Sequence, residues 1–538
     1  MINKEVTDLT ELLTPEAEDL IPIIHDPSGT PVNRKITLAN LQNKLSYAYI
    51  IIKSGLNYIA YNDIGVAVST STDFAVPLQY AIDALGDTGG KIVIKGGSTY
   101  TFTVAHYAVG DTVAQTMKIG VDLNYDNLHL VIEKGATITQ AASLQLQVFF
   151  AGNIAGTGNG EVIDNTTIEC YGWIDGNYAN QGYSASGTEF QACPIAMYST
   201  NGYFPYLQAK NFGQYSALVL YYGPNNRIGY INAKDSYTAL GGAGCLDLER
   251  NSHATVGVLN GNSLAGAVMT IQDGGDHINI GVINAKDCMY SLQLETASSL
   301  ALTDIQVGEV NGDGYKTGIP YYKPQIRISV SASFGASQNI QIGKVNIKNS
   351  AVDGMYIGFS GDASGSVNRV HIDSVIIRNS VQVADQGGNG AMTIGLCDSV
   401  SIDNFIAYDD QVVKTQAWGI KFVTGVTNFL CSGGNVTGNT GAITGFTTSM
   451  GKIKNLIGFV TENSGTGTIA SGATSAIITH GLAVTPTLDN ISIVGGENPT
   501  TDIGTIWVDT IGATYFTVNC EVAPSTSNFD FGWRAQIL

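Results

Sequence analysis

Acidic residues alternate with leucines in one short segment near the middle of the chain. If Leu246-Asp247-Leu248-Glu249 forms a strand that buries both leucines, both carboxyl groups point away from the core. Positions two apart along a strand lie about 7 Å from each other. Two carboxyl groups at such a distance can divide the work of acid–base catalysis, one donating a proton while the other activates a water molecule.

Glu295 holds the same place as Glu249 in a matching segment two repeats later. Neighbouring strands lie about 4.8 Å apart, so these two backbones would be separated by roughly 10 Å. Inverting glycosidases keep their acid and base about 6.5–9.5 Å apart, with water between them. Either pair, Asp247/Glu249 or Glu249/Glu295, can reach that range. We therefore predict Asp247, Glu249 and Glu295 as catalytic candidates, with Asp273 able to replace either partner of a pair.

Amide, guanidinium and phenol groups occupy the same outward columns. Gln272, Gln293 and Arg327 would contact sugar hydroxyls. Close packing of the carboxyl groups should raise the pKa of one of them and suit it as the acid. The predicted stacking surfaces for sugar rings are Tyr221, Tyr222, Tyr290 and Tyr356.

Other interpretations of these residues stay open. Outward polar residues on a strand also form an ordinary solvated face, and among 45 acidic residues some cluster by chance. Asp353, Asp362 and Asp385 form a competing acidic group on later turns, and a site between subunits is invisible in one sequence. A β-eliminating lyase would instead need a basic residue, such as Lys421 or Arg327, facing a uronate.

The element that would position these residues is an apolar triplet at positions i, i+2 and i+5. It recurs at intervals of 24 to 35 residues between Ile231 and Phe405, and an apolar-x-apolar pair runs in phase with it. Such a period indicates stacked coils, none of which can bury its apolar face alone. The clearest triplets are Ile278/Ile280/Ile283, Ile305/Val307/Val310, Ile340/Ile342/Val345, Val370/Ile372/Val375 and Val400/Ile402/Phe405.

The triplets predict a parallel β-helix. Val and Ile favour strands, and the segments between triplets are rich in Gly, Ser, Asn and Asp without the helical segment of a leucine-rich repeat. An Asn follows the third apolar residue in five copies. Because Asn tolerates left-handed backbone, we predict a tight bend at these positions, with the amides of successive coils forming a ladder. These residues are Asn232, Asn260, Asn284, Asn311 and Asn346.

Composition narrows the class of protein. The formal net charge of −19 over 538 residues disfavours binding to nucleic acid or to anionic membranes. There is no run of 18 apolar residues for a membrane span, and the first residues lack the apolar region of a secretory signal. The seven cysteines form no C-x-x-C pair. We expect them to be buried thiols of a protein made in a reducing compartment, and we predict no disulfide, metal or cofactor.

The two ends of the chain differ from its middle. Residues 1–45 predict a small module of two strands and a short helix, Leu38 to Leu45. Residues 46–115 predict a cap, with a helix whose apolar residues run from Leu78 to Leu85 and which ends at Gly86. Residues 116–462 form the β-helix, with a polar insertion at about 177–200. Residues 463–538 alternate polar and apolar positions in short runs and predict an antiparallel β-sandwich. His480 beside a turn glycine is interpreted as structural.

Several of these segments resemble parts of bacteriophage tailspike and tail fibre proteins. Residues 1–45 resemble segments that attach such fibres to the virion. The helix, Gly89-Gly90, a Val/Ile strand and Tyr100 resemble the entry cap of pectate-lyase-like tailspikes, although Lys95 stands where those have Pro and no Gly-Asp-Gly cluster precedes it. The order His480-Gly481-Leu482, alternating strands and Trp533-Arg534 resembles a sandwich that often closes tailspikes.

The resemblance implies a right-handed single-stranded parallel β-helix that assembles as a homotrimer. It also implies a virion tail protein, attached to a tail or baseplate protein through residues 1–45. Such a protein would recognise and hydrolyse a bacterial surface polysaccharide, capsule or O-antigen, as an endo-acting depolymerase. The alternatives are a non-catalytic receptor-binding adhesin of the same architecture and a polysaccharide lyase.

Overall fold

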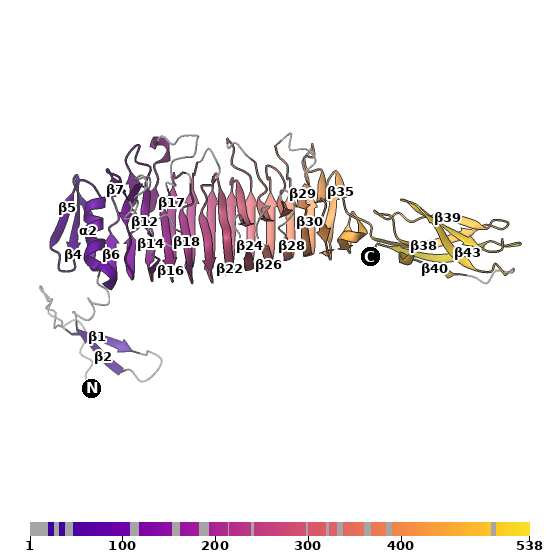
Figure 1. Cartoon of the computed structure of the whole chain (residues 1–538), viewed down its shortest axis with the longest axis horizontal. Helices are drawn as coiled ribbons and strands as arrows, with labels where there is room; N and C mark the ends of the chain where they lie inside the picture. Colours follow the sequence, from indigo (N-terminus) through magenta and orange to yellow (C-terminus); the bar gives the residue numbers. More distant parts are fainter. Residues whose placement is uncertain are drawn as a thin grey trace, which may run out of the picture.

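The structure of the protein is a computed structural model. It describes residues 20–25, 32–37, 47–107, 118–152, 162–181, 193–213, 215–237, 242–296, 300–318, 322–330, 337–359, 367–383, 390–496 and 502–537. Within these ranges the chain is all-β except for short 3₁₀ turns and the helix α2 (Ala75–Leu85). Parallel strands follow one another along a rod, with α2 at its N-terminal end and two antiparallel sheets beyond its other end (Figure 1). The predicted parallel β-helix is confirmed.

Each central coil carries one short strand and one long strand. The short strands stack into a parallel sheet that we call the acidic sheet, because it contains Asp247, Glu249 and Glu295. It consists of β18 (Leu218–Pro224), β20 (Leu246–Ser252), the first part of β22 (Ala267–Lys286), β23 (Tyr290–Thr296), β25 (Ile326–Val330), β27 (Met355–Phe359), β29 (Gly390–Ile394) and β31 (Trp418–Phe422).

Each long strand turns a corner in its middle. In β26, Ile340 and Ile342 are buried, Gly343 and Lys344 both face outward, and Val345 is buried again, so the alternation of a straight strand is broken once. The first halves form the middle sheet and the second halves form the amide sheet. These strands are β19 (Arg227–Lys234), β21 (Thr255–Asn262), the remainder of β22, β24 (Leu302–Asp313), β26 (Ser337–Lys348), β28 (Val367–Arg378) and β30 (Cys397–Tyr408).

The core is the stack of inward residues from all three sheets. Every residue of the five predicted triplets is buried, and so is every residue of the paired column from Leu246/Leu248 to Ile420/Phe422. The register joins like positions, for example Ile280 with Val307 and Val307 with Ile342. Burying this apolar surface is the main favourable term in folding. It also fixes which residues point outward on each coil.

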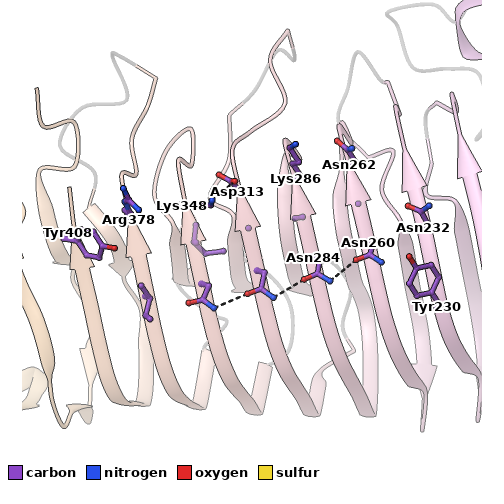
Figure 2. Close-up of a pocket in the computed structure, with 17 residues that line it drawn as sticks. Tyr230, Asn232, Asn260, Asn262, Asn284, Lys286, Asp313, Lys348, Arg378 and Tyr408 are labelled. Carbon is purple, nitrogen blue, oxygen red and sulfur yellow. Dashed lines mark hydrogen bonds and ion pairs between the residues drawn. The ribbon is translucent and has the colours of Figure 1, made fainter. Parts of the chain in front are cut away.

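The asparagines lie elsewhere than predicted. Asn260, Asn284, Asn311 and Asn346 sit within strands of the amide sheet and do not have left-handed backbone, so the predicted bend at these residues is wrong. Left-handed residues lie before the middle sheet, as at His253, and directly after the amide sheet, as at Asn349. The predicted ladder is confirmed (Figure 2). The Nδ2 atoms of Asn284, Asn311 and Asn346 each donate to the Oδ1 of the preceding asparagine in the column, at 2.8, 3.0 and 3.1 Å.

A column of glycines occupies the corner of the long strands. A Cβ built on Gly281 would lie 2.5 Å from the carbonyl oxygen of Gly257, and one on Gly308 would lie 2.6 Å from that of Gly281. Gly229, Gly257 and Gly343 make equally close approaches to the coil before them. In these five coils glycine lets the corners stack at strand spacing, whereas β28 and β30 carry Asp373 and Asp403 at the same position.

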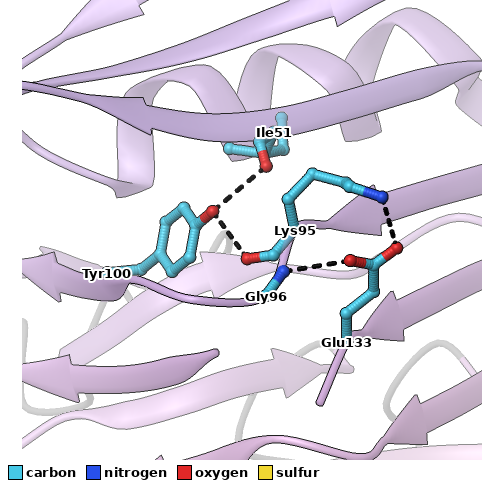
Figure 3. A network of polar contacts seen from close by, with 5 residues as sticks. All are labelled: Ile51, Lys95, Gly96, Tyr100 and Glu133. Carbon is cyan, nitrogen blue, oxygen red and sulfur yellow. Dashed lines mark hydrogen bonds and ion pairs between the residues drawn. The ribbon is translucent and has the colours of Figure 1, made fainter. Parts of the chain in front are cut away.

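The cap agrees with its sequence pattern and explains Lys95. The helix α2 ends at Gly86, and Asp73 Oδ1 accepts a hydrogen bond from the backbone N–H of Ala75 (3.1 Å). The Nζ of Lys95 and the backbone N–H of Gly96 both donate to Glu133 of the next coil, at 2.6 and 3.0 Å (Figure 3). Although partial burial acts to raise the pKa of Glu133, these two donors lower it overall. Lys95 thus ties the cap to the first full coil.

The terminal segments also form strands. β1 (Leu20–His25) pairs antiparallel with β2 (Val32–Thr37), while the predicted helix Leu38–Leu45 falls outside the described residues. Two three-stranded antiparallel sheets share one core near the C-terminus, which confirms the predicted sandwich. They are β38 (Glu462–Ile469), β43 (Phe529–Gln536) and β40 (Ile491–Gly495), and β39 (Ser475–Thr479), β42 (Tyr515–Cys520) and β41 (Ile506–Ile511).

His480, the cysteines and the polar insertion each have a defined place in the structure. His480 is fully buried and its Nδ1 accepts from the Leu482 N–H at 3.0 Å, which confirms a structural role. All seven cysteines are buried free thiols. The polar insertion is shorter than predicted, because β16 (Ile195–Thr200) already pairs with β18. In the described part of the chain no helix is long and apolar enough to cross a membrane.

Replacing Gly281 by alanine should impair folding. The new Cβ meets a backbone oxygen that cannot move without separating two coils, so we expect a loss of at least about 1–3 kcal/mol, the usual cost of overpacking. The control is Gly433→Ala, whose Cβ would stand 3.7 Å from its nearest neighbour. Urea unfolding followed by circular dichroism measures both. Equal midpoints for the two variants would contradict a steric role for the glycine column.

Candidate active site on the acidic sheet

Parallel register brings the predicted acidic residues onto one face. Glu249 lies beside Gln272, and Gln272 lies beside Glu295, on three consecutive coils. One position earlier in the outward alternation, Asp247 is followed by Thr270, Gln293 and Arg327. The register brings these residues side by side, as predicted, because equal positions of successive strands lie in line in a parallel ladder.

Gln272 joins the two carboxyl groups of β20. Its Nε2 donates to Glu249 Oε1 at 2.9 Å and also contacts Asp247 Oδ2 at 3.4 Å. Since both oxygens contact one nitrogen at hydrogen-bond range, they lie within about 6 Å of each other. Asp247 and Glu249 therefore form a close carboxyl pair, at or below the lower limit for acid and base in an inverting glycosidase.

Glu295 is held by two donors. The Nε2 of Gln293 donates to Glu295 Oε2 at 2.6 Å, and Arg327 Nη2 lies 3.1 Å from Glu295 Oε1. The two contacts involve different oxygens of Glu295, so they fix the position of its carboxyl group.

Aromatic residues cover one side of the β20 carboxyl groups. Asp247 points away from the solenoid core and yet is only 5% exposed. Burial raises the pKa of Tyr215 and that of Tyr221, and the nearby charges of Glu249 and Asp247 raise both further. Tyr215 and the buried Cys193 belong to this cover and were not foreseen from the sequence. The repeat pattern carries no signal for them, since they come from segments between strands.

The predicted stacking tyrosines divide into two groups. Tyr221 and Tyr290 are buried, at 8% and 6% exposure, so their rings offer little surface to a ligand. Tyr222 and Tyr356 are half-buried. The guanidinium of Arg250 lies 4.8 Å from the centre of the Tyr222 ring and also donates to its hydroxyl oxygen. The side chain of Asp273 lies outside the described residues.

Asp353 lies just before β27, whose Tyr356 continues the column of Arg327. It is 6% exposed, and burial raises its pKa to about 7, although Thr393, Lys421 and a backbone N–H at Gly390 act to lower it. Thr393 and Lys421 continue the column above Arg327 and Tyr356. Asp362 and Asp385, its predicted companions, lie outside the described residues. The competing acidic group is therefore represented here by one carboxyl with a neutral partner and a nearby lysine.

In the described part of the chain, two clusters of Asp and His side chains on the middle sheet could coordinate a divalent metal ion. They are Asp276/His277/Asp304 and His371/Asp373/Asp403, and the candidate ligand atoms of each group lie within 4.8 Å of one another. In the second group the Nδ1 of His371 is 2.8 Å from Ser401 Oγ, and the Nε2 is 3.0 Å from Asp373 Oδ1. Both groups are partly or fully exposed, and they are separate from the acidic sheet.

Comparisons with known proteins give fold-level similarity only. No family model matches the chain, and no curated protein matches it. Among solved structures it is similar to a double mutant of the tailspike protein of E. coli bacteriophage HK620, at 11% identity, with a TM-score of 0.42 and coverage of 97% of this chain and 98% of that one. A single mutant of that tailspike in complex with a pentasaccharide gives 13% identity, a TM-score of 0.37 and coverage of 98% and 99%. We therefore build the functional proposal on the residues of this chain.

The raised pKa of Asp353 predicts a pH dependence of stability. The folded chain holds this proton more tightly than the unfolded chain, whose aspartate titrates near 3.8. The stabilising contribution is therefore complete below about pH 4 and declines as the pH rises toward 7. Asp353→Asn should raise the melting temperature at pH 8 and leave it nearly unchanged at pH 4, at about 1.4 kcal/mol per pKa unit.

The control for this prediction is Asp63→Asn, because Asp63 is exposed on a turn of the cap. Melting curves by differential scanning fluorimetry from pH 4 to pH 8 measure both variants. If Asp353→Asn lowers the melting temperature equally across that range, Asp353 is ionised in the folded protein and the assignment is wrong.

Proposed function

We propose that the protein is a phage tailspike that binds and hydrolyses a bacterial surface polysaccharide, capsule or O-antigen, on its acidic sheet. The observation that supports the proposal is the column Glu249, Gln272, Glu295, in which two carboxyl groups on one flat face are separated by one coil and each is bonded to an amide. Carboxyl pairs with room for water between them are the machinery of inverting glycoside hydrolysis.

In this proposal Glu295 is the base. Arg327 and Gln293 hold its carboxyl group in place, and its proposed role is to activate a water molecule for attack on the anomeric carbon. Asp247 and Glu249 share one amide donor and lie close together, and in this proposal one of the two carries the proton that the acid needs. Glu249, the more exposed of the two, gives that proton to the leaving glycosidic oxygen.

The distance between the carboxyl groups favours Glu249 and Glu295 as the acid–base pair over Asp247 and Glu249. The β20 pair is too close for a water molecule in line with the scissile bond, whereas residues two coils apart have backbones roughly 10 Å apart. Their side chains can bring the two carboxyl groups to the separation of about 6.5–9.5 Å found in inverting glycosidases. Arg327 and the amide oxygens of Gln272 and Gln293 are the proposed contacts to sugar hydroxyls, with Tyr222 and Tyr356 as the exposed aromatic contacts.

The organisation of the chain supports the tailspike part of the proposal. A small N-terminal hairpin, a capped β-helix and a terminal sandwich follow one another in the order that the sequence resemblance implies. We propose assembly as a homotrimer, attachment to a tail or baseplate protein through residues 1–45, and a place on the virion tail. A stacked β-helix offers a long flat wall suited to a polymeric ligand.

A non-catalytic adhesin is the second candidate, and one observation favours it. Both carboxyl oxygens of Glu295 are already engaged, one by Arg327 and one by Gln293, which leaves less room for a catalytic water molecule. The same face would then bind the polysaccharide without cleaving it. A lyase has less support, because Arg327, one of its two basic candidates, is the residue paired with Glu295.

Glu249→Gln and Glu295→Gln should each abolish cleavage while leaving assembly intact. We expect at least a 100-fold loss of reducing-end release from host polysaccharide, the usual minimum for removing an acid or a base. The control is Glu309→Gln, which removes a carboxylate of the amide sheet that pairs with Lys344 at 3.3 Å. Analytical ultracentrifugation confirms that the oligomer is unchanged.

Two results would count against this assignment. Full activity in both variants removes these carboxyl groups from the mechanism. Polysaccharide binding with no reducing-end release and no unsaturated-uronate absorbance by the natural protein selects the adhesin.

A further inference from the structure

A groove lies on the amide sheet, away from the acidic sheet. Its volume is about 580 Å³, and the asparagine ladder lies along it (Figure 2). It extends over the coils of β19 to β30, with Tyr230 near one end and Tyr408 near the other. The acidic residues assigned to hydrolysis do not line it. It is therefore a separate surface of the same solenoid.

The groove is cationic on a strongly acidic chain. Lys286, Lys348 and Arg378 line it, and among its described lining residues Asp313 is the one acid. Arg378 is paired with Asp410, which does not line the groove. Lys286 and Lys348 are exposed. Lys348 pairs with Asp313 at 2.8 Å, and because an ammonium has three N–H donors, this bond leaves two for another acceptor. Against a formal charge of −19, such a concentration of cations selects an anionic ligand.

The stacking of the coils sets the distance between the cationic side chains of the groove. Lys286, Asp313, Lys348 and Arg378 are consecutive positions of one column, so Lys286 and Lys348 are two coils and roughly 10 Å apart. That length corresponds to about two pyranose units of an extended chain. Carboxylates on alternate sugars of a polysaccharide would therefore meet successive lysines.

The amide column along the groove suits sugar hydroxyls. Each ladder bond uses one of the two N–H groups of an asparagine, so the second N–H of each amide can donate to a ligand. Tyr230 stacks on Tyr206 with ring centres 4.9 Å apart, and the guanidinium of Arg378 lies 5.7 Å from the centre of the Tyr408 ring. Cations, amides and aromatic rings are the groups that bind acidic sugars.

We propose that this groove is a second, non-catalytic binding site for an anionic polysaccharide segment that carries a carboxylate on alternate sugars. Among the described residues that line the groove Asp313 is the single carboxyl group, so the acid–base pair of a glycosidase is not formed by them. It goes beyond the proposed hydrolysis and does not depend on it. By holding a neighbouring stretch of polymer, it would raise the effective concentration of the chain at the acidic sheet.

A hyaluronan decasaccharide tests the site directly, since its uronates alternate with neutral sugars. By isothermal titration calorimetry at low salt, the full-length protein should bind it and should not bind maltodecaose. The double variant Lys286→Gln/Lys348→Gln should weaken binding at least about 10-fold, because it removes two charged donors, and added salt should weaken it as well. The matched control is Lys344→Gln, since Lys344 lies four residues from Lys348, is exposed and does not line the groove.

Three outcomes would overturn the proposal. They are equal binding of both decasaccharides, equal loss in the control and the double variant, and a double variant whose oligomeric state by analytical ultracentrifugation differs from that of the natural protein. The last would show that the groove is a contact between copies of the chain. Binding that persists in Glu249→Gln, which leaves the groove intact, separates this result from the outcome at the acidic sheet.

Discussion

The hydrogen-bonded stacking of coils is the constraint on which the rest of the structure depends. Parallel strands about 4.8 Å apart bring equal positions of successive coils into line, so residues some 24 to 35 positions apart in sequence become neighbours in a column. Each column then has its own chemistry: apolar residues inside, glycines at one corner, amides on one face and carboxyl groups on another. A substitution in one coil therefore affects its contacts with the coils on either side.

Much of this could be predicted from the sequence alone, because each coil of a solenoid repeats the same spacing of apolar residues along the chain. The triplet from Ile278 to Ile283 and its repeats determine which side chains point inward, and with them the register of Glu249, Gln272 and Glu295. The amide ladder followed from the same repeat. Its location did not, because in these coils the corner lies at the glycine three residues earlier, as at Gly281, and Asn284 lies in the strand after it.

What could not be predicted lies between the repeats. Asp247 was expected on an exposed face and is buried, because Tyr215 and Cys193 reach over β20 from irregular segments. Tyr221 and Tyr290 are buried in small side clusters for the same reason. The burial that raises the pKa of Asp353 likewise depends on how a turn packs near Thr393 and Lys421. The alternation of polar and apolar residues along a strand predicts whether a side chain points inward or outward. It does not predict which residues of a loop cover an outward side chain.

Two faces of the solenoid divide opposite charges between them. The acidic sheet concentrates carboxyl groups held by glutamine amides, and the amide sheet concentrates lysines beside a ladder of asparagines. In both, the polar groups come at coil spacing, which is the kind of surface that a repeating polymer can match along its length. The central claim is that Glu249 and Glu295 meet one sugar chain across their shared face. A crystal structure of the Glu295→Gln variant with a host polysaccharide fragment tests this most directly. Our account predicts a sugar ring lying across β20, β22 and β23 within contact of Glu249 and residue 295; a fragment bound on another face, with the acidic sheet bare, would contradict it.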